Sequence, residues 1–376
     1  MSRAPKSKEY DAEDATPEAD RLEGFPHPRE TEILIGQAAA ERTLADALAS
    51  GRMHHAWLMA GPEGVGKATL AYRFARTALS PPAERGDGLA IARDSVVARQ
   101  VRALSHPGLM LIRRVYNRDT KKHSQGIPVD EVRRIKDFLQ HSASTGAYRI
   151  VIVDRAEEMA PAAANAVLKS LEEPPARTVF LLVSSEPGRL LPTIHSRCRR
   201  LDVLPLGEAD LLAAVGGALA AGGVAAPKPE AMPLITALAE CSVRRALTLI
   251  AGGAVERHGK IVRMLADLPR LDVEGVHRLA DGLTGAANEP EFLMFFSLLQ
   301  GVIARVLRRA ATAEPMLPPE AAFGARVTEA GPERLAAWAE AWEAVARDKG
   351  EAMALNLDRK ALILGVWERL RQAAAP

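Results

Sequence analysis

The stretch LMAGPEGVGKATLAYRFAR, residues 58–76, decides the fold of this 376-residue chain. It follows the pattern G-x-x-x-x-G-K-[ST] of a phosphate-binding loop, or P-loop, up to the last position. Gly61, Gly66 and Lys67 occupy the defining places, and Gly64 lies between them. The backbone N–H groups of such a loop bind anionic phosphates at a helix N-terminus, and the lysine adds a point charge. These four residues are therefore the predicted nucleotide-binding set of the loop.

The segments around the loop have the character that a P-loop requires. Residues 55–60 form a short apolar run that predicts a buried strand, and residues 66 to about 79 have helical character. A further helix is predicted at about 37–50 from apolar residues spaced three and four apart. A strand, a glycine-rich turn and a helix in this order favour a phosphate-binding ancestry over an ordinary glycine turn before a lysine.

The last position of the pattern departs from a working P-loop. Ala68 stands where Ser or Thr would bind Mg²⁺. Thr69 does not replace the missing hydroxyl, because one residue further along a helix its side chain points about 100° away. The loop thus keeps its phosphate-binding part without the group that positions the metal.

Further strands alternate with helices after the loop. Residues 148–154 (YRIVIVD) are typical of a central parallel strand, and a helix is predicted from Pro161 to the pair Pro174-Pro175. Residues 178–185 predict a third buried strand, and 198–206 are the candidate for a fourth. This alternation predicts an α/β domain with a parallel sheet and a site at the carboxyl ends of its strands.

Asp154 ends the second predicted strand, where a Walker-B aspartate would hold Mg²⁺. An ATPase of this class also needs a carboxylate that orients the attacking water, usually the next residue. That residue is Arg155, whose guanidinium stays protonated and cannot act as a base. Glu157 and Glu158 are near in sequence. Their positions imply, however, that their side chains leave the strand end in a different direction from that of the missing carboxylate. Together with Ala68, this loss predicts a site that does not hydrolyse ATP well.

Changes in composition divide the chain into four parts. Residues 1–24 are polar and predict a disordered tail, and residues 25–206 carry the P-loop domain. Residues 207–253 predict a small helical domain. Residues 254–376 predict a further helical bundle.

The balance of charge and the cysteines restrict the function. Lys and Arg total 49 against 47 Asp and Glu, a net charge of +2, which argues against a dedicated, strongly basic nucleic-acid-binding domain. The basic cluster at 113–124 is interpreted as a solvated loop between strands rather than as a contact with DNA or a partner. Cys198 and Cys241 support neither a zinc site nor a disulfide framework, so no metal is expected. The scarcity of cysteine fits a reduced cytoplasmic compartment. The N-terminus lacks the apolar region of a secretory signal, and no run of 18 uninterrupted apolar residues suggests a membrane span.

Several motifs together resemble a known family. In chain order they are GPEGVGKAT, VIVDRAEEM, NAVLKSLEEPP, SSEPGRLLPTIHSRCR and CSVRRAL. This order resembles the bacterial clamp-loader branch of the AAA+ proteins over about residues 30–250, and LEEPP and SRC are its most specific parts. NLDRKALI, residues 356–363, is similar to C-terminal regions of the family. The resemblance implies an AAA+ domain over 25–206, a helical lid domain over 207–253 and a helical collar domain over 254–376.

The resemblance also implies roles for single residues. Arg197, the arginine of SRC, would act in trans on the ATP site of an adjacent motor subunit, where such an arginine contributes on the order of 10³–10⁵ in rate. Taken alone, a surface arginine is more often a solvated residue. Arg244 lies at the sensor-2 position and would face the chain's own phosphate pocket, and Ser184 or Ser185 occupies the sensor-1 region.

The resemblance also places the family's adenine pocket at Ile35, Gly36 and Gln37.

Two departures from the family pattern matter. Residues 79–112 contain no cysteine, so the family's four-cysteine zinc module is absent. A motor subunit would also keep the Walker-A hydroxyl and the Walker-B glutamate. The resemblance therefore favours a non-motor subunit.

The resemblance implies that this chain is a non-catalytic subunit of the DNA polymerase III clamp loader, which helps to place the sliding clamp on primed DNA. The implied partners are the γ/τ and δ subunits, the clamp and, through the complex, the DNA. No cofactor is required, and residual ATP or ADP binding at Lys67, Asp154 and Arg244 stays open. One alternative is an active ATPase in which Glu157 or another carboxylate replaces the missing base. The other is a regulatory protein that binds ATP without turnover.

Overall fold

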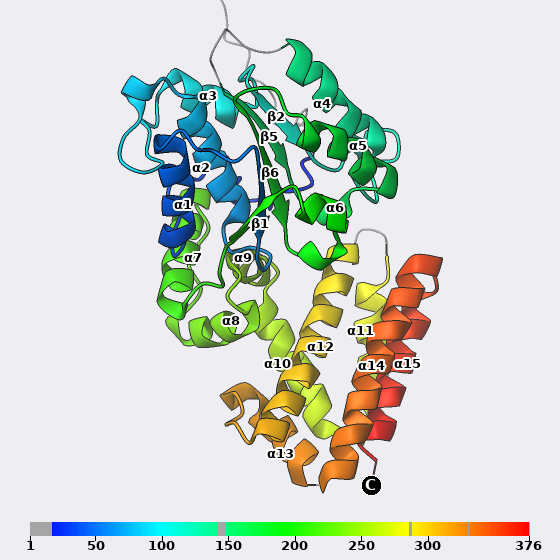
Figure 1. The fold of residues 1–376 in the computed structure, drawn as a ribbon. Coiled ribbons are helices and arrows are strands. Elements are labelled where there is room, and N and C mark those ends of the chain that lie inside the picture. The colour runs from blue at the N-terminus through cyan, green and yellow to red at the C-terminus, as the bar shows by residue number, and fades with distance from the viewer. Residues whose placement is uncertain (1–16, 142–147, 286–287, 330, 376) are drawn as a thin grey trace, which may run out of the picture. The chain divides into compact units, whose positions relative to one another are not determined.

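The computed structural model describes residues 17–141, 148–285, 288–329 and 331–375. The chain forms two compact units (Figure 1). Unit 1 runs to Ala226 and also takes in Cys241–Arg244, whereas unit 2 comprises Pro227–Glu240 and the chain from Arg245 onward.

Unit 1 is built on a five-stranded parallel sheet in the order β2-β5-β6-β1-β7. Its strands are β1 (Ala56–Ala60), β2 (Leu109–Ile112), β5 (Arg149–Val153), β6 (Thr178–Ser184) and β7 (Arg199–Asp202). The sheet confirms the predicted parallel α/β fold and all four predicted strands. Strand β2 was not predicted, because an apolar run of four residues has no periodicity that distinguishes it from a loop.

Helices cover both faces of the sheet (Figure 1). One face carries α1 (Ala38–Ala49), α2 (Lys67–Leu79) and α3 (Val96–Arg102), and the other carries α4 (Val129–His141), α5 (Pro161–Glu172) and α6 (Pro192–His195). Helices α1, α2 and α5 confirm the sequence predictions, whereas α3 and α4 were not predicted.

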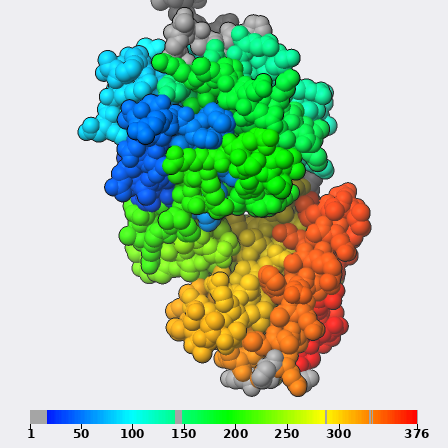
Figure 2. Space-filling model, viewed as in Figure 1, coloured from blue at the N-terminus to red at the C-terminus, as the bar shows by residue number. Residues whose placement is uncertain are grey.

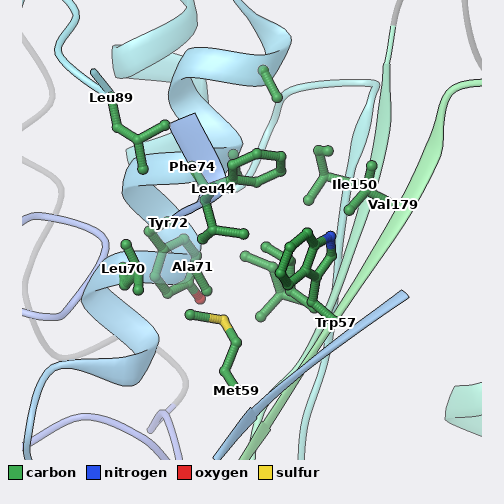
Figure 3. Packing of buried hydrophobic residues seen from close by; sticks show 14 of the residues in the cluster. Leu44, Trp57, Met59, Leu70, Ala71, Tyr72, Phe74, Leu89, Ile150 and Val179 are labelled. Atoms are coloured by element: carbon green, nitrogen blue, oxygen red, sulfur yellow. The ribbon is translucent and has the colours of Figure 1, made fainter. Parts of the chain in front are cut away.

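The side chains of β1 point alternately to the two faces of the sheet and so contact both layers of helices. Trp57 and Met59 pack on the α1–α3 side, and Ala56 and Leu58 pack on the α4–α6 side. Figure 3 shows Trp57 and Met59 among side chains that include Tyr72 of α2. Because both faces are covered, β1 is buried along its whole length, as expected of a parallel strand. This burial fixes the strand whose carboxyl end leads into the P-loop.

The segment before α1 is packed onto unit 1 rather than free. The Asp20 carboxylate is buried, and its Oδ2 lies 2.9 Å from Nε2 of His27. The Arg29 amide donates to His27 Nδ1, so the imidazole proton is on Nε2 and is donated to Asp20. Arg113 forms ion pairs with both Glu18 and Asp20. The predicted tail over 1–24 is therefore wrong for residues 17–24, while residues 1–16 lie outside the described part of the chain.

The basic cluster at 113–124 is more ordered than a solvated loop. It contains the antiparallel pair β3 (Tyr116–Asn117) and β4 (Lys122–His123). At its base, Arg113 pairs with Glu18 and Asp20, and Arg114 Nε lies 2.9 Å from Glu158 Oε2. The interpretation as a solvated loop is therefore wrong at the base of the cluster.

Helices make up unit 2, apart from short turns. It contains α8 (Met232–Ala239), most of α9 (Val243–Ala251), α10 (Ala254–Asp267), α11 (Val273–Leu283), α12 (Glu289–Thr312), α13 (Ala321–Glu329), α14 (Gly331–Leu355) and α15 (Arg359–Ala373). Helices α14 and α15 lie side by side, in the orange and red part of Figures 1 and 2. Because α7 (Glu208–Gly222) belongs to unit 1, the two units do not test the predicted lid and collar boundaries, which stay predictions.

Helix α12 is the core helix of unit 2. Its length and its mean hydropathy of 1.4 over an 18-residue window would also suit a membrane span, but half of that window is buried inside the protein. Core helices of soluble proteins pass the same test of length and composition. Arg305 of this helix is itself buried, with its guanidinium on the buried carboxylate of Glu320.

Candidate functional site

The P-loop follows β1 directly and ends at Gly66, the N-cap of α2. Gly66 has φ +103° and Gly64 has φ +76°, a region that glycine enters without the strain of a side chain. A Cβ on Gly64 would also lie 2.1 Å from Ser242 Oγ, because residues 242–244 pack on the loop and the Val243 amide donates to the Gly64 carbonyl at 2.9 Å. These contacts require glycine at position 64.

The backbone of the loop keeps the form of a phosphate cradle. Within the described residues, no hydrogen bond uses the amides of residues 63–67, which precede and begin the 13-residue helix α2. Free amides at a helix N-terminus attract anions. The backbone therefore fits a phosphate.

The Lys67 ammonium lies inside the loop. It donates to the Gly61 carbonyl at 2.7 Å, to the Pro62 carbonyl at 2.5 Å and to Ser185 Oγ at 3.0 Å, and the residue is 4% exposed. Burial lowers the pKa of Lys67 to about 8, although the carboxylates of Glu157, Glu63 and Asp154 oppose this shift. All three protons of the ammonium thus have acceptors within the chain.

The metal half of the site does not fit Mg²⁺. Ala68 has no side-chain oxygen that could bind the ion, and Asp154 is buried at the carboxyl end of β5. Burial raises the pKa of Asp154 to about 7, and neighbouring carboxylates add to the shift while Arg155 opposes it. Among the described residues, no group of three or more His, Cys, Asp or Glu side chains is arranged to hold a metal ion. The chain therefore offers a cradle for phosphate without an evident magnesium site.

A carboxylate of the loop holds two arginines that sequence analysis had not linked to it. Glu63 Oε1 forms an ion pair with Arg155 Nη2 and lies 3.5 Å from Arg244 Nε. Arg155 also contacts Glu158 at 3.2 Å, and Arg244 Nη1 donates to the Asp20 carbonyl at 2.9 Å. The pattern G-x-x-x-x-G-K leaves position 63 free, so no signal in the motif indicates this role for Glu63.

Glu157 lies closer to the site than its place in the sequence suggests. Its Oε1 accepts from the Ser185 amide at 3.0 Å, and Ser185 Oγ in turn accepts from Lys67. Its Oε2 is buried without a hydrogen-bond partner in the described structure. The expectation that Glu157 points away from the strand end is therefore wrong. Between the two sensor-1 candidates, Ser185 contacts Lys67, whereas the Ser184 hydroxyl is buried and unpaired among the described residues.

The segment predicted to line an adenine pocket braces the loop. Gln37 Nε2 donates to the Val65 carbonyl at 3.0 Å and to the Leu204 carbonyl at 2.8 Å. A Cβ on Gly36 would lie 2.5 Å from Leu206 Cδ2. The role of Ile35, Gly36 and Gln37 in binding adenine stays a prediction.

Arg197 lies near the amino ends of the strands, whereas the P-loop residues lie at their carboxyl ends. Strands β1 and β7 are parallel, with Trp57 opposite Arg199 and Ala60 opposite Asp202. Arg197 precedes β7 and is therefore near the amino end of β1, whereas Gly61 follows its carboxyl end. At a rise of about 3.3 Å per residue, the strands separate the two positions by more than ~13 Å.

The Arg197 side chain is held at the surface of its own unit. Nη2 lies 2.6 Å from Glu172 Oε1, and Nη1 donates to the Thr193 carbonyl at 3.0 Å and to Ser196 Oγ at 3.2 Å. An open hollow of about 460 Å³ adjoins the guanidinium and is lined by His54, His55, Leu171, Glu172, Ser196 and Arg197.

The structure thus brings six of the predicted site residues together and leaves one apart. Gly61, Gly64, Gly66, Lys67, Asp154 and Arg244 gather at the carboxyl edge of the sheet. Arg197 alone lies at the amino edge. The nucleotide and trans roles of all seven residues stay predictions.

Comparison with known proteins agrees with this architecture. The family described as "DNA polymerase III, delta subunit" matches residues 36–207, which carry the sheet and the P-loop. The DNA polymerase III subunit delta' of Pseudomonas aeruginosa is 38% identical over 144 residues, which cover 38% of this chain and 41% of that protein. The subunit gamma of Buchnera aphidicola (Schizaphis graminum) is 28% identical over 223 residues, covering 59% of this chain and 58% of that protein.

The similarity does not extend over the whole of these relatives. The chain spans less than two thirds of the length of each, from 41% to 58%. A solved structure of a DNA polymerase III gamma subunit-related protein from Thermotoga maritima aligns with 88% of this chain and 99% of that chain, at 18% identity and a TM-score of 0.40, a level that adds nothing to the assignment. From the family match and the two relatives it follows that residues 36–207 are similar to the DNA polymerase III delta-subunit family, and that the chain is similar to the subunits delta' and gamma of DNA polymerase III.

Proposed function

We propose that this protein is the δ′ subunit of the DNA polymerase III clamp loader. In this role it does not hydrolyse ATP itself, but supplies Arg197 to the ATP site of a neighbouring motor subunit. It helps the ring to load the sliding clamp onto primed DNA in the cytoplasm. Its partners are the γ/τ and δ subunits and the clamp, and it meets DNA through the complex.

The observation that carries the proposal is the separation of Arg197 from the chain's own P-loop. The two lie at opposite edges of one rigid parallel sheet, so the guanidinium cannot reach a phosphate bound at Lys67. Yet Arg197 is partly exposed and borders an open hollow. An arginine in this place is suited to an anion on another subunit, where it stabilises the charge of phosphoryl transfer.

The chain's own site supports the non-hydrolysing part of the proposal. Ala68 leaves the P-loop without its Mg²⁺ ligand, and Arg155 stands where a base is needed. The Arg155 guanidinium is instead engaged with Glu63 and Glu158. A site that lacks the metal ligand and the adjacent base loses both groups that position the reactants.

The test is steady-state ATPase of a loader reconstituted with motor and δ subunits, clamp and primed DNA. Arg197→Ala should lower kcat of the complex at least about tenfold, because the charge on the transferred phosphoryl group loses a cation. The isolated chain should show no ATPase above background. The matched control is Arg189→Ala, because Arg189 is exposed and, among the described residues, its ion pair is the local one with Glu186 at 3.1 Å.

The complex must also assemble normally in this test, which gel filtration of the Arg197→Ala loader establishes. If an intact ring turns over ATP at the wild-type rate with Ala at position 197, the trans role is refuted. Turnover by the isolated chain would refute the non-hydrolysing role.

A second candidate function is an active ATPase that uses Glu157 as its base. The contact of Glu157 with Ser185, next to Lys67, and its unpaired Oε2 favour this alternative. It predicts ATPase activity of the isolated chain that Glu157→Gln abolishes. The first proposal predicts that neither the wild type nor this variant has such activity.

A further inference from the structure

The P-loop of this chain combines an open backbone with engaged side chains. The amides of residues 63–67 have no acceptor among the described residues. By contrast, Lys67 donates to the loop's own carbonyls, and Arg155 and Arg244 both contact Glu63. A phosphate in the loop would therefore find backbone amides without acceptors. The nearby cations, by contrast, already have partners within the chain.

Carboxyl groups lie among the cations around the loop. Four cations, Lys67, Arg114, Arg155 and Arg244, lie with the carboxylates of Glu63, Glu157 and Glu158 and with the Asp154 carboxyl, whose pKa is raised to about 7. A triphosphate normally arrives with Mg²⁺, which neutralises part of its charge. Because Ala68 removes the oxygen that would hold this ion, a nucleotide would meet the carboxylates without such compensation.

Among these carboxylates, Glu63 has the decisive position. Its Oε1 is shared by Arg155, from the end of β5, and Arg244, from the start of α9. The glutamate itself is half exposed and belongs to the loop, so it occupies the neighbourhood of the cradle rather than a distant surface. Its single negative charge is shared by two guanidinium groups that lie next to the cradle.

We propose that Glu63 is a built-in counter-anion of the P-loop, which keeps the nucleotide affinity of this chain low by holding Arg155 and Arg244. Removing its charge releases both arginines from Glu63, while Arg155 keeps its contact with Glu158 and Arg244 keeps its hydrogen bond to the Asp20 carbonyl, and it leaves the backbone cradle intact. The chemical class of ligand that then binds is a nucleoside triphosphate. The inference concerns the chain alone and does not depend on a trans role of Arg197.

The expected gain is limited by solvent. Ion pairs between partly exposed groups contribute little to binding or stability, and the side chains of Glu63, Arg155 and Arg244 are 50%, 31% and 30% exposed. Loss of the two pairs, together with one fewer negative charge, should therefore raise affinity about tenfold.

The test measures binding of a fluorescent ATP analogue to the full-length chain by anisotropy, in Mg²⁺ and in EDTA. Glu63→Gln keeps the shape of the side chain and should bind the analogue about tenfold more tightly than the wild type. Because Mg²⁺ has no ligand at Ala68, the gain should be similar in both buffers. Glu208→Gln is the matched control, an exposed glutamate at the first turn of α7, and should bind as the wild type does.

Two double variants test whether the tighter binding of the ATP analogue occurs at the P-loop. Adding Lys67→Ala to Glu63→Gln should abolish it, and adding Arg155→Gln should reduce it, because the freed guanidinium is lost. Thermal unfolding of each variant shows whether it is folded, and Glu63→Asp provides a second variant that keeps the charge and should stay weak.

The proposal is overturned if Glu63→Gln binds no more tightly than the wild type, whether both bind well or neither binds. It is also overturned if the gain persists without Lys67. Neither result bears on the ATPase of the reconstituted loader with Arg197→Ala, so the two proposals fail separately.

Discussion

The guanidinium of Arg197 lies 2.6 Å from the carboxylate of Glu172, the last residue of α5. The pair joins the SRC and LEEPP motifs, which are 25 positions apart in the chain. Thr193 and Ser196 hold the other terminal nitrogen of the same guanidinium. The orientation of Arg197 is thus determined by α5 and α6 together.

This pair leads to a prediction for Glu172→Ala. The free energy of unfolding should change by less than about 1 kcal/mol, because both side chains are partly exposed. On the proposed trans role of Arg197, kcat of the reconstituted loader should fall severalfold with KM nearly unchanged, since Arg197 loses the group that orients it. Glu172→Gln, which keeps an acceptor, should restore part of the rate. Glu186→Ala, in the exposed pair with Arg189, is the control; an unchanged kcat for Glu172→Ala would contradict the prediction.

A second prediction concerns the buried ion cluster of unit 2. Glu320 Oε1 lies 2.6 Å from Arg305 Nη2 and 2.9 Å from His258 Nε2, and all three residues are at most 3% exposed. Glu320→Gln should destabilise unit 2 by about 3–5 kcal/mol, because it leaves the Arg305 charge buried without a counter-ion. Urea unfolding followed by tryptophan fluorescence measures this. The exposed pair of Arg278 and Glu274 serves as the reference, and Glu274→Gln should change stability by less than ~0.5 kcal/mol.

The same glutamate predicts a dependence of stability on pH. Burial alone would raise the pKa of Glu320, but the hydrogen bonds from His258 and Arg305 and the Arg305 charge lower it below the usual 4.5. A carboxylate whose pKa is lowered by folding contributes its full stabilisation above the unfolded-state pKa. This contribution is lost as pH falls through the folded-state pKa. Unfolding of the wild type from pH 7 down to pH 3 should therefore show a loss of stability that is smaller in Glu320→Gln. Equal pH slopes for the two proteins would show that Glu320 is not responsible.

Asp154 should show the opposite sign. Folding raises the pKa of Asp154 from 3.8 to about 7. Between these two pH values, the Asp154 carboxyl is protonated in the folded state and ionised in the unfolded state. Stability is therefore lost as pH rises from about 4 to about 7. Asp154→Asn should remove this penalty and stabilise the protein at pH 8 by up to about 4 kcal/mol, at 1.36 kcal/mol per pKa unit. Unfolding at pH 5 and pH 8 checks the prediction, and an equal effect at the two values would refute it.

Gly64 provides a test of the packing on the P-loop. Gly64→Ala should destabilise unit 1 by about 2 kcal/mol or more, because φ is +76° and the new Cβ would lie 2.1 Å from Ser242 Oγ and 2.8 Å from Arg244 Cβ. Gly188→Ala is the control, since nothing lies within 4 Å of a Cβ there and its φ is not positive. The comparison uses thermal unfolding of both variants. Equal melting temperatures would mean that residues 242–244 do not pack on the loop as described.

Much of unit 1 could be predicted because its signals are local. The apolar runs at 55–60, 148–154 and 178–185 identify buried strands by composition, and the glycines before Lys67 identify the turn that follows β1. Strand β2 has four residues, too few for a periodic signal. Residues 17–24 misled the prediction, because a polar segment is ordered here by partners such as Arg113, more than 90 positions away.

By itself, the sequence determined the motif order, the parallel α/β fold and the departures of Ala68 and Arg155 from the ATPase motifs, since each depends on residue type at a short spacing. Only the tertiary structure decided which side chains meet. It placed Glu63 between Arg155 and Arg244, brought Glu157 to Ser185, and set Arg197 at the far edge of the sheet from Lys67. The physical reason is that ion pairs and hydrogen bonds act over a few ångströms in space, and strand order and register bring distant positions within that range.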